Sequence, residues 1–366
     1  RPHEVVALLE RRGIKTVPTG LAHGTVTAVV PSRHFEITTL RRDVETFGRR
    51  ARVSFDADWA ADAARRDFTI NAIFLAPNGV IHDPVGGVAD LRAGRLRFVG
   101  DPATRIAEDV LRLLRYYRFA ARFGGIAGDP QARAACRAAA HLLPDLSGER
   151  VAAELFRLLD AADPARALQM MAEDGVLAVV LPLPCRLDRL GRLIAIEAAP
   201  DPLRRLAALI EADQRGAVAL AERLRLSNAC RERLCSLVNP DHDPDLLGAR
   251  AAWRRALYRL GAGWFRDRVM LLAAAGRIDA GAVTPRLALA DGWVSPVFPL
   301  GGDDVLALGI EPGPRVGALL GAVASWWEAS DFTEGRDACL ARLAELAAAT
   351  ADPRGSGRDD ASDPTP

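Results

Sequence analysis

Hydrophobic and polar positions follow two different periods along the chain. From about Val17 to Val99, short runs in which apolar and polar residues alternate, such as TVTAVV, HFEITTL, TINAIFL and LRFVG, are separated by PSR, APNG and DPVGG. A period of two between turn residues predicts β-strands. One helix, HEVVALLERRG, precedes these strands, and we expect it to end at Gly13 because a glycine suits a helix C-terminus.

A helical period replaces the alternation after Gly100. Asp101 and Pro102 suit the cap and the first turn of a helix, which we expect to continue through about Phe123. Beyond it the chain is rich in alanine and leucine with helical spacing, as in GERVAAELFRLLDA, so the last two-thirds is predicted to be all-helical. Residues 350–366 are small, polar or helix-breaking, which predicts a disordered tail.

Composition and charge restrict the possibilities only in part. A chain of 366 residues that is 49% apolar and 26% charged is long enough for more than one domain. The net charge of +1 means that a nucleic-acid partner would be bound by a local basic surface. Five cysteines without a C-x-x-C pair, and the lack of a run of about 20 apolar residues, favour a cytoplasmic protein with free thiols and no membrane segment.

The stretch EDVLRLLRYYRF carries the first candidate chemistry. On one helix, residues three apart are neighbours, so Asp109, Arg112 and Arg115 are predicted to share a face, with Arg118 at its edge. A carboxylate accepts hydrogen bonds and a guanidinium donates them. The Watson–Crick edges of cytosine and adenine offer an amino donor beside a ring-nitrogen acceptor, whereas guanine and uracil present the reverse. Asp109 and Arg112 therefore predict selection of C or A, and Arg115 and Arg118 are placed for phosphates. A salt-bridged surface helix is the alternative.

A second stretch, ARRDFTINAIF, places Arg65, Arg66 and Asp67 before a predicted strand in which Thr69 and Asn71 alternate with apolar residues. By itself this cluster is either a solvated strand edge or a binding site. Together with PTGLAHGTVT, HFEITTLRRDVETFGRRARVSF, EDVLRLLR and LSGERVAAELFRLL, however, it closely resembles the class II tRNA nucleotidyltransferase and poly(A) polymerase family from about residue 4 to residue 180.

The resemblance implies an enzyme that adds C, C and A to the 3′ end of tRNA from CTP and ATP, without a nucleic-acid template and with release of pyrophosphate. It places a nucleotide contact on Arg66, base reading on Asp109 and Arg112, and further nucleotide contacts on Arg115 and Arg118. The basic segment 41–50 looks like the family's flexible loop, which helps the switch from C to A. The implied partners are tRNA, CTP and ATP, and the oligomeric state is left open.

The family's metal-binding motifs set a further expectation. The sequence lacks the G-G-x-x-R-D turn and the D-x-D pair that bind the triphosphate and Mg²⁺ in such enzymes. Glu36, between Phe35 and Ile37, matches the third acidic position, although an ordinary edge-strand glutamate is the alternative. Since the chain also begins with Arg1, we expect a fragment whose cofactor is Mg²⁺ but whose metal-binding pair is absent.

The implied architecture is α+β. A nucleotidyltransferase head of the polymerase β type, incomplete at its N-terminus, is expected over residues 1–100. An all-helical neck at 101–180, and a tRNA-binding body and tail at 181–349, are expected to follow it. Poly(A) synthesis is an alternative within the same family. A catalytically inactive protein that binds RNA or nucleotides is an alternative from a different class.

Overall fold

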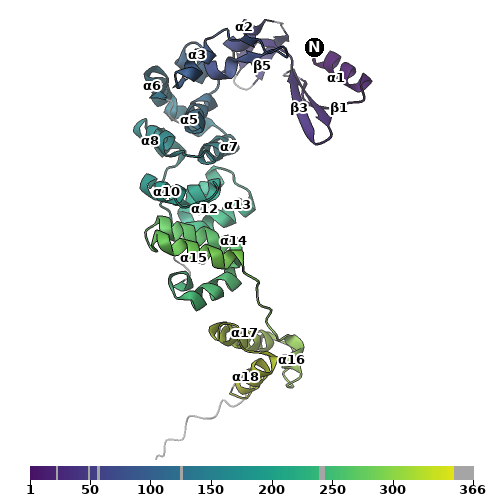
Figure 1. Ribbon diagram of the computed structural model, residues 1–366, viewed down its shortest axis with the longest axis vertical. Coiled ribbons are helices and arrows are strands. Elements are labelled where there is room, and N and C mark those ends of the chain that lie inside the picture. The colour runs from purple at the N-terminus through teal and green to yellow at the C-terminus, as the bar shows by residue number, and fades with distance from the viewer. Residues whose placement is uncertain (22–23, 48–49, 56–57, 124–126, 239–243, 350–366) are drawn as a thin grey trace, which may run out of the picture. The chain divides into compact units, whose positions relative to one another are not determined.

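The computed structural model describes residues 1–21, 24–47, 50–55, 58–123, 127–238 and 244–349, with the backbone alone for 19, 41–47, 50–55, 127 and 244 (Figure 1). The chain divides into two compact units, Arg1–Asn239 and Pro240–Pro366. The predicted boundaries at residues 100 and 180 fall inside the first unit and stay predictions. The segment 350–366, predicted to be disordered, lies outside the described residues.

The first unit opens with a helix packed on a small antiparallel sheet (Figure 1). The strand order is β1-β2-β3, from α1 (Pro2–Arg11), β1 (Lys15–Gly20), β2 (Thr25–Val30) and β3 (Arg33–Thr38). Val26 and Ala28 are buried on one face of β2, and α1 contacts β1 and β2. Gly13 has a φ of +69°, which confirms the predicted end of the first helix.

Short elements follow the sheet: β4 (Arg41–Phe47), β5 (Arg50–Phe55), α2 (Trp59–Ala64), the 3₁₀ helix η2 (Thr69–Ala72), β6 (Phe74–Leu75), β7 (Ile81–His82), α3 (Gly87–Arg92) and β8 (Arg95–Leu96). Residues 41–47 and 50–55 pair as antiparallel strands, whereas the segment 41–50 was expected to be a loop. The predicted strand TINAIFL was also wrong, because its first half is η2. The Thr69 hydroxyl donates to the buried Asp90 of α3 at 2.7 Å, a contact with a residue 21 positions away that the local alternation of TINAIFL does not reveal.

Helices make up most of the remainder of this unit: α4 (Pro102–Glu108), α5 (Leu111–Phe123), α6 (Pro130–Ala139), α7 (Gly148–Leu159), α8 (Ala165–Glu173), α9 (Val176–Val180), α10 (Leu187–Ile194), α11 (Pro202–Leu209), α12 (Gln214–Arg223) and α13 (Asn228–Leu237), with the 3₁₀ helix η3 (Ala140–Asp145) after α6. The short strand β9 (Ala127–Gly128) pairs in parallel with β8. The single helix predicted from Asp101 to Phe123 was wrong, since α4 ends at Glu108 and α5 begins at Leu111.

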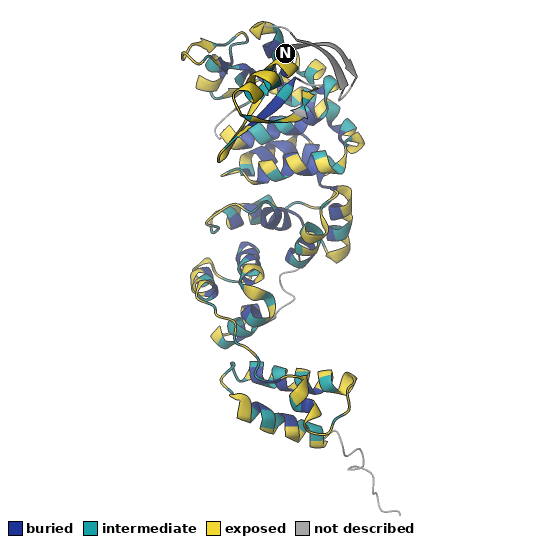
Figure 2. Ribbon diagram, turned by 90° about the vertical axis from the view of Figure 1, so that its right-hand side faces the viewer, coloured by how far each residue is buried: buried dark blue, intermediate teal, exposed yellow. Residues whose placement is uncertain are grey.

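Buried carboxylates that each hold arginines connect these helices. Asp174, after α8, accepts from Arg133 of α6 and from the Tyr117 hydroxyl of α5, each at 2.8 Å. The Glu197 side chain is 2% exposed and pairs with the consecutive Arg204 and Arg205 of α11. Figure 2 shows the same division throughout the helices, with buried residues facing neighbouring helices and exposed ones facing outward. A buried charge without a partner is costly, so each cluster fixes the spacing of its elements.

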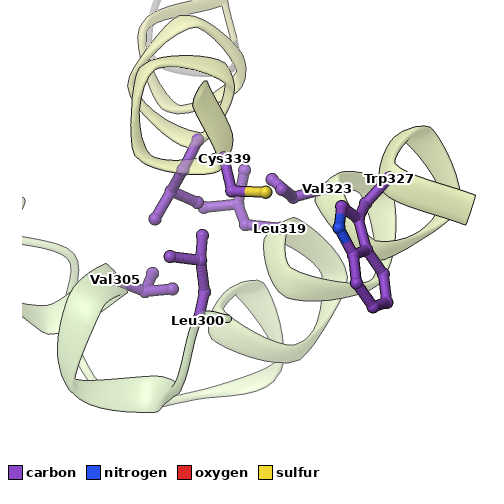
Figure 3. Close-up of a cluster of buried hydrophobic side chains, with 7 residues drawn as sticks. Leu300, Val305, Leu319, Val323, Trp327 and Cys339 are labelled. Carbon is purple, nitrogen blue, oxygen red and sulfur yellow. The ribbon is translucent and has the colours of Figure 1, made fainter. Parts of the chain in front are cut away.

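The second unit is helical, as predicted: η5 (Pro244–Leu247), α14 (Arg250–Ala274), η6 (Ala280–Ala282), α15 (Val283–Asp291), α16 (Gly302–Leu306), α17 (Pro314–Ala329) and α18 (Arg336–Ala349). Gly261, with φ at +75°, interrupts α14. Figure 3 shows how Leu300 and Val305 meet Leu319 and Trp327 of α17 and Cys339 of α18 in one apolar core. No helix in the described part of the chain is long and apolar enough to cross a membrane.

The contact between α3 and η2 generates a prediction about stability. A Cβ at Gly87 would lie 2.1 Å from the Thr69 carbonyl oxygen, so Gly87→Ala must displace backbone. We expect it to lower the free energy of unfolding by about 1–3 kcal/mol in urea denaturation of the whole chain followed by circular dichroism. Gly191→Ala is the matched control, because Gly191 lies in α10 with open space around its Cβ position. It should stabilise by roughly 0.5–1 kcal/mol. Equal effects of the two substitutions would contradict the prediction.

Candidate functional site

A cavity of about 560 Å³ in the first unit brings together three separate parts of the chain. It is lined by Thr38 at the end of β3, by Arg65, Arg66, Asp67 and Asn71 around η2, and by Asp109, Arg112, Arg115 and Phe119 at the start of α5. The lining therefore includes four arginines and two aspartates. The predicted residues Arg66, Asp109, Arg112 and Arg115 meet here, and the excess of cations suits an anionic ligand.

Asp109 lies between α4 and α5, where the predicted single helix is broken, and it lines the cavity there. Its backbone is extended, with φ −153° and ψ 105°, and its Oδ1 accepts from the Leu111 amide at 3.2 Å, as a residue that caps α5 does. The predicted shared helix face is thus replaced by a cap. Arg150 of α7 donates from one nitrogen to Oδ1 at 2.9 Å and to Oδ2 at 2.8 Å. Sequence reasoning missed this contact, although Arg150 lies in the stretch LSGERV.

Arg112 ties the start of α5 to the end of α2. It pairs with Glu108, and it donates to the Arg105 carbonyl at 3.0 Å and to the Arg65 carbonyl at 3.1 Å. Arg105 also pairs with Glu108, at 2.8 Å, and donates to the Ala64 carbonyl at 2.9 Å. The last carbonyls of α2, which lack helical partners, are therefore satisfied by the α4–α5 segment.

Asp67 connects η2 to α5. Its Oδ1 accepts from the Asn71 amide nitrogen at 2.9 Å, and its Oδ2 accepts from Arg115 Nε at 2.7 Å. Asp67 is largely buried, and charge-assisted bonds of this kind are strong. Arg115 therefore enters the cavity with its guanidinium already oriented by an acid on the opposite wall.

Arg66 is supported from behind by Asp62 of α2, which sequence reasoning also missed. Asp62 Oδ2 accepts from Arg66 Nε at 3.0 Å, and Oδ1 accepts from Arg65 Nε at 2.8 Å. Burial alone would raise the pKa of Asp62, but the hydrogen bonds and charges of the two arginines hold that pKa below its usual range. Asp62 lies three and four residues before the two arginines, and on a helix this spacing is the signal that could have revealed it.

Two further predicted residues, Arg118 and Glu36, are not among those that line the cavity. Arg118 Nε lies 2.7 Å from the buried Glu154 of α7, and its guanidinium covers the Phe119 ring at 4.5 Å. This geometry gives no support to its predicted phosphate contact. Glu36 is exposed on β3, opposite Thr27 of β2. Because side chains alternate along a strand, Glu36 shares a face with Thr38, which lines the cavity.

Metal ligation can be tested on the described residues. Within them, no three side chains of His, Cys, Asp or Glu come close enough together to hold a metal ion. Glu36 contributes one carboxylate, which does not fit a two-metal site by itself. The chemistry that the cavity does support is recognition of a ligand with both a polar planar group and an anionic group. Asp109 accepts and Arg112 donates at one place, and Arg66 and Arg115 present positive charge at others.

Family models match two parts of the chain. The head domain of poly(A) polymerase matches residues 1–97, and a probable RNA- and SrmB-binding site of polymerase A matches residues 127–186. The first match covers the sheet and η2. The second begins at β9 and extends just beyond α9.

Curated relatives extend the similarity over nearly the whole chain. CCA tRNA nucleotidyltransferase 1, mitochondrial, from Danio rerio is 30% identical over 360 residues, which covers 94% of this chain and 81% of the relative. The Homo sapiens protein of the same name is 31% identical over 358 residues, with 93% and 80% covered. The CCA-adding enzyme of Geobacillus stearothermophilus is 37% identical over 177 residues, with 48% and 43% covered.

Solved structures share the fold. The crystal structure of Bacillus stearothermophilus CCA-adding enzyme in complex with CTP superposes with a TM-score of 0.78 at 28% identity, covering 96% of this chain and 87% of that one. Thermotoga maritima CCA-adding enzyme complexed with tRNA superposes with a TM-score of 0.64 at 18% identity, covering 93% and 83%. The α+β fold class, with a small sheet followed by helices, is confirmed.

Asp90, behind η2, generates a prediction about pH. It is fully buried and accepts from Thr69, from Arg95 Nε at 2.7 Å and from Arg97 Nε at 2.9 Å. Burial works to raise the pKa of Asp90, but these hydrogen bonds lower it by more. Its stabilising effect is therefore present above the unfolded-state pKa of about 4, and is lost as pH falls through the folded-state value. Asp90→Asn should lower the free energy of unfolding at pH 7, and this free energy should then fall less between pH 7 and pH 3 than it does in the parent.

Urea midpoints between pH 7 and pH 3 measure this effect. Asp145→Asn, at an exposed position, is the control and should keep the parent's pH profile. If Asp90→Asn loses stability between pH 7 and pH 3 as steeply as the parent does, other carboxylates are responsible for the acid sensitivity.

Proposed function

Because the chain belongs to the class II tRNA nucleotidyltransferase and poly(A) polymerase family, we propose that its cavity selects CTP and ATP for addition to the 3′ end of tRNA. The chain is a nucleotidyltransferase that adds C, C and A to tRNA and releases pyrophosphate. The observation that carries the role of the cavity is that Asp109 and Arg112 line the same 560 Å³ space as the cationic side chains of Arg66 and Arg115.

Base selection follows from the acceptor and donor at the start of α5. The Leu111 amide and Arg150 take up both acceptor sites of Asp109 Oδ1 and one of Oδ2 among the described contacts. A carboxylate has about four lone-pair sites, so Oδ2 can still accept from the exocyclic amino group of cytosine or adenine. Arg112 then donates to the ring nitrogen. Uracil and guanine would place a carbonyl oxygen against Asp109 and a ring N–H against Arg112, and neither pair forms a hydrogen bond.

Arg66 and Arg115 are proposed to bind the phosphates, the charged part of the nucleotide. Arg66 and Arg115 are each oriented by an aspartate, so their positive charge is in place before a ligand arrives. Electrostatic attraction of this kind does not depend on the base, and it should therefore serve CTP and ATP alike. Arg118 stays a weaker candidate, because its charge is directed to Glu154.

The metal, the partners and the location complete the proposal. Enzymes of this family generally use a divalent metal, and we propose Mg²⁺ for this chain. Glu36 is our candidate for one of its ligands, and by itself it does not complete a two-metal site. Relatives bound to CTP, ATP and tRNA support the same partners here. A cytoplasmic location stays a prediction, because relatives include both mitochondrial and bacterial proteins.

Asp109→Ala tests base selection. Removing the acceptor should reduce the preference for C over U by about 5- to 150-fold, since a two-point polar contact contributes roughly 1–3 kcal/mol of discrimination. The measurement is the ratio of the efficiencies with which CTP and UTP are incorporated onto a tRNA that lacks its C-C-A end. Three added nucleotides, C-C-A, distinguish this reaction from poly(A) synthesis, which would add a run of A.

Arg115→Ala is the paired variant for this test. It should weaken the use of CTP and UTP together and leave their ratio near the parental value, because Arg115 is proposed to contact the charged part of the nucleotide. If correctly folded Asp109→Ala keeps the parental ratio of CTP to UTP incorporation, Asp109 does not select the base, and its contact with Arg150 is only a structural salt bridge.

Arg66→Ala tests the cationic part of the cavity without requiring catalysis. Binding of CTP and of ATP, measured by isothermal titration calorimetry with Mg²⁺ present, should weaken by a similar factor of about 10 or more, as expected when a charge-assisted contact worth roughly 1.5–3 kcal/mol is removed. Loss of ATP binding alone would mean that Arg66 reads a base. Retention of both affinities would contradict the proposed nucleotide contact.

A further inference from the structure

Asp62 lies behind the cavity wall and holds two consecutive cavity arginines. Its side chain is 1% exposed. One carboxylate oxygen accepts from Nε and Nη2 of Arg65, and the other lies 3.0 Å from both Nε and Nη2 of Arg66. Asp62 does not line the cavity itself. Its effect on a ligand would therefore be transmitted through the two guanidiniums.

Arg66 is restrained on its other sides as well. Its Nη1 donates to the Asn71 carbonyl at 3.0 Å, and its guanidinium lies over the Phe74 ring at 4.8 Å. A guanidinium has five N–H donors, and these contacts within the described residues use three of them. Two donors remain for a ligand, which is the number that a bidentate contact with a phosphate requires.

The backbone beside Arg66 is fixed from the opposite side of the cavity. The carbonyls of Ala64 and Arg65, at the end of α2, accept from Arg105 and Arg112 at 2.9 and 3.1 Å. The remaining freedom of Arg66 is in its long side chain, which otherwise occupies many rotamers. The bond to Asp62 restricts that freedom before the ligand binds, and ordering a side chain in advance improves affinity.

We propose that Asp62 is a positioning residue for nucleotide binding, which aligns Arg66, and with it Arg65, towards the charged part of CTP and ATP. The inference rests on the proposed function, because it takes a nucleotide as the ligand of the cavity. Asp62 itself touches no nucleotide. Its contribution is to present two guanidinium N–H groups in one fixed orientation.

The negative charge of Asp62, taken by itself, predicts the opposite change in nucleotide affinity, so the direction of the change tests the inference. Asp62 is an anion close to a site for an anionic ligand, so removing its charge would strengthen the binding of CTP if electrostatic attraction were all that mattered. If Asp62 positions Arg66, the neutral Asp62→Asn should weaken binding, because the amide nitrogen cannot accept from a guanidinium and one arginine loses its partner.

The experiment is a double-mutant cycle on the whole chain. Affinities for CTP and ATP are measured by calorimetry with Mg²⁺ present for the parent, Asp62→Asn, Arg66→Ala and the double variant. Asp62→Asn should weaken both nucleotides by about 2- to 13-fold, which corresponds to the ordering of one rotamer-rich side chain. In the Arg66→Ala background the same substitution should produce a much smaller loss, because only the alignment of Arg65 then remains to be disturbed.

Two variants separate positioning from a general loss of stability. Glu197→Gln removes a matched carboxylate, equally buried between two consecutive arginines but not among the residues that line the cavity. It should lower the unfolding midpoint and leave nucleotide affinity unchanged. Asp62→Glu keeps the charge and moves the carboxylate by one methylene, so it should also weaken binding. This variant supplies the result if Asp62→Asn fails to fold.

The outcomes distinguish the inference from the function on which it rests. Folded Asp62→Asn or Asp62→Glu that binds CTP as tightly as the parent, or more tightly, overturns the inference while a weakened Arg66→Ala leaves the proposed function standing. A loss from Asp62→Asn that persists undiminished in the Arg66→Ala background also overturns it. If Arg66→Ala itself binds normally, the proposed nucleotide contact fails and the inference fails with it.

Discussion

Pairing of guanidiniums with carboxylates is the interaction on which the rest of this structure depends. Arg66 is held by Asp62, Arg112 by Glu108 and Arg115 by Asp67. Partly buried cations need such partners, because removing a charge from water is costly unless it is paired. The cavity is therefore a set of arginines already oriented by acids, and a ligand meets donors whose positions are largely fixed.

A bond from an arginine to the backbone couples the two functions proposed for the cavity. Arg112, which would read the base, also donates to the Arg65 carbonyl, one residue before Arg66, which would bind the charged part of the nucleotide. A shift of α5 would therefore move the backbone beside Arg66. With the roles proposed here, selection of the base and binding of the anion would be served by one connected network and not by two independent patches.

Several elements could be predicted from sequence because their signals are local. The helix that ends before Gly13, the strands at 25–30 and 33–38 and the helical remainder follow from periodicity and turn residues. The break at Asp109 was missed, since a helical spacing of charges outweighed the preference of aspartate for a cap. The TINAIFL segment was missed for a different reason: Thr69 bonds to Asp90, which lies 21 residues away.

For the site, the sequence by itself determined the chemistry: which side chains accept, which donate, and that Arg66, Asp109, Arg112 and Arg115 belong to one family pattern. Tertiary structure decided how they meet. Arg150 reaches Asp109 across 41 residues and Arg115 reaches Asp67 across 48. Motifs record residue types at short spacing, whereas the partner of a buried charge is set by the packing of helices that are distant along the chain. That is why Arg66, Asp109, Arg112 and Arg115 could be named in advance, whereas most of their supporting partners could not.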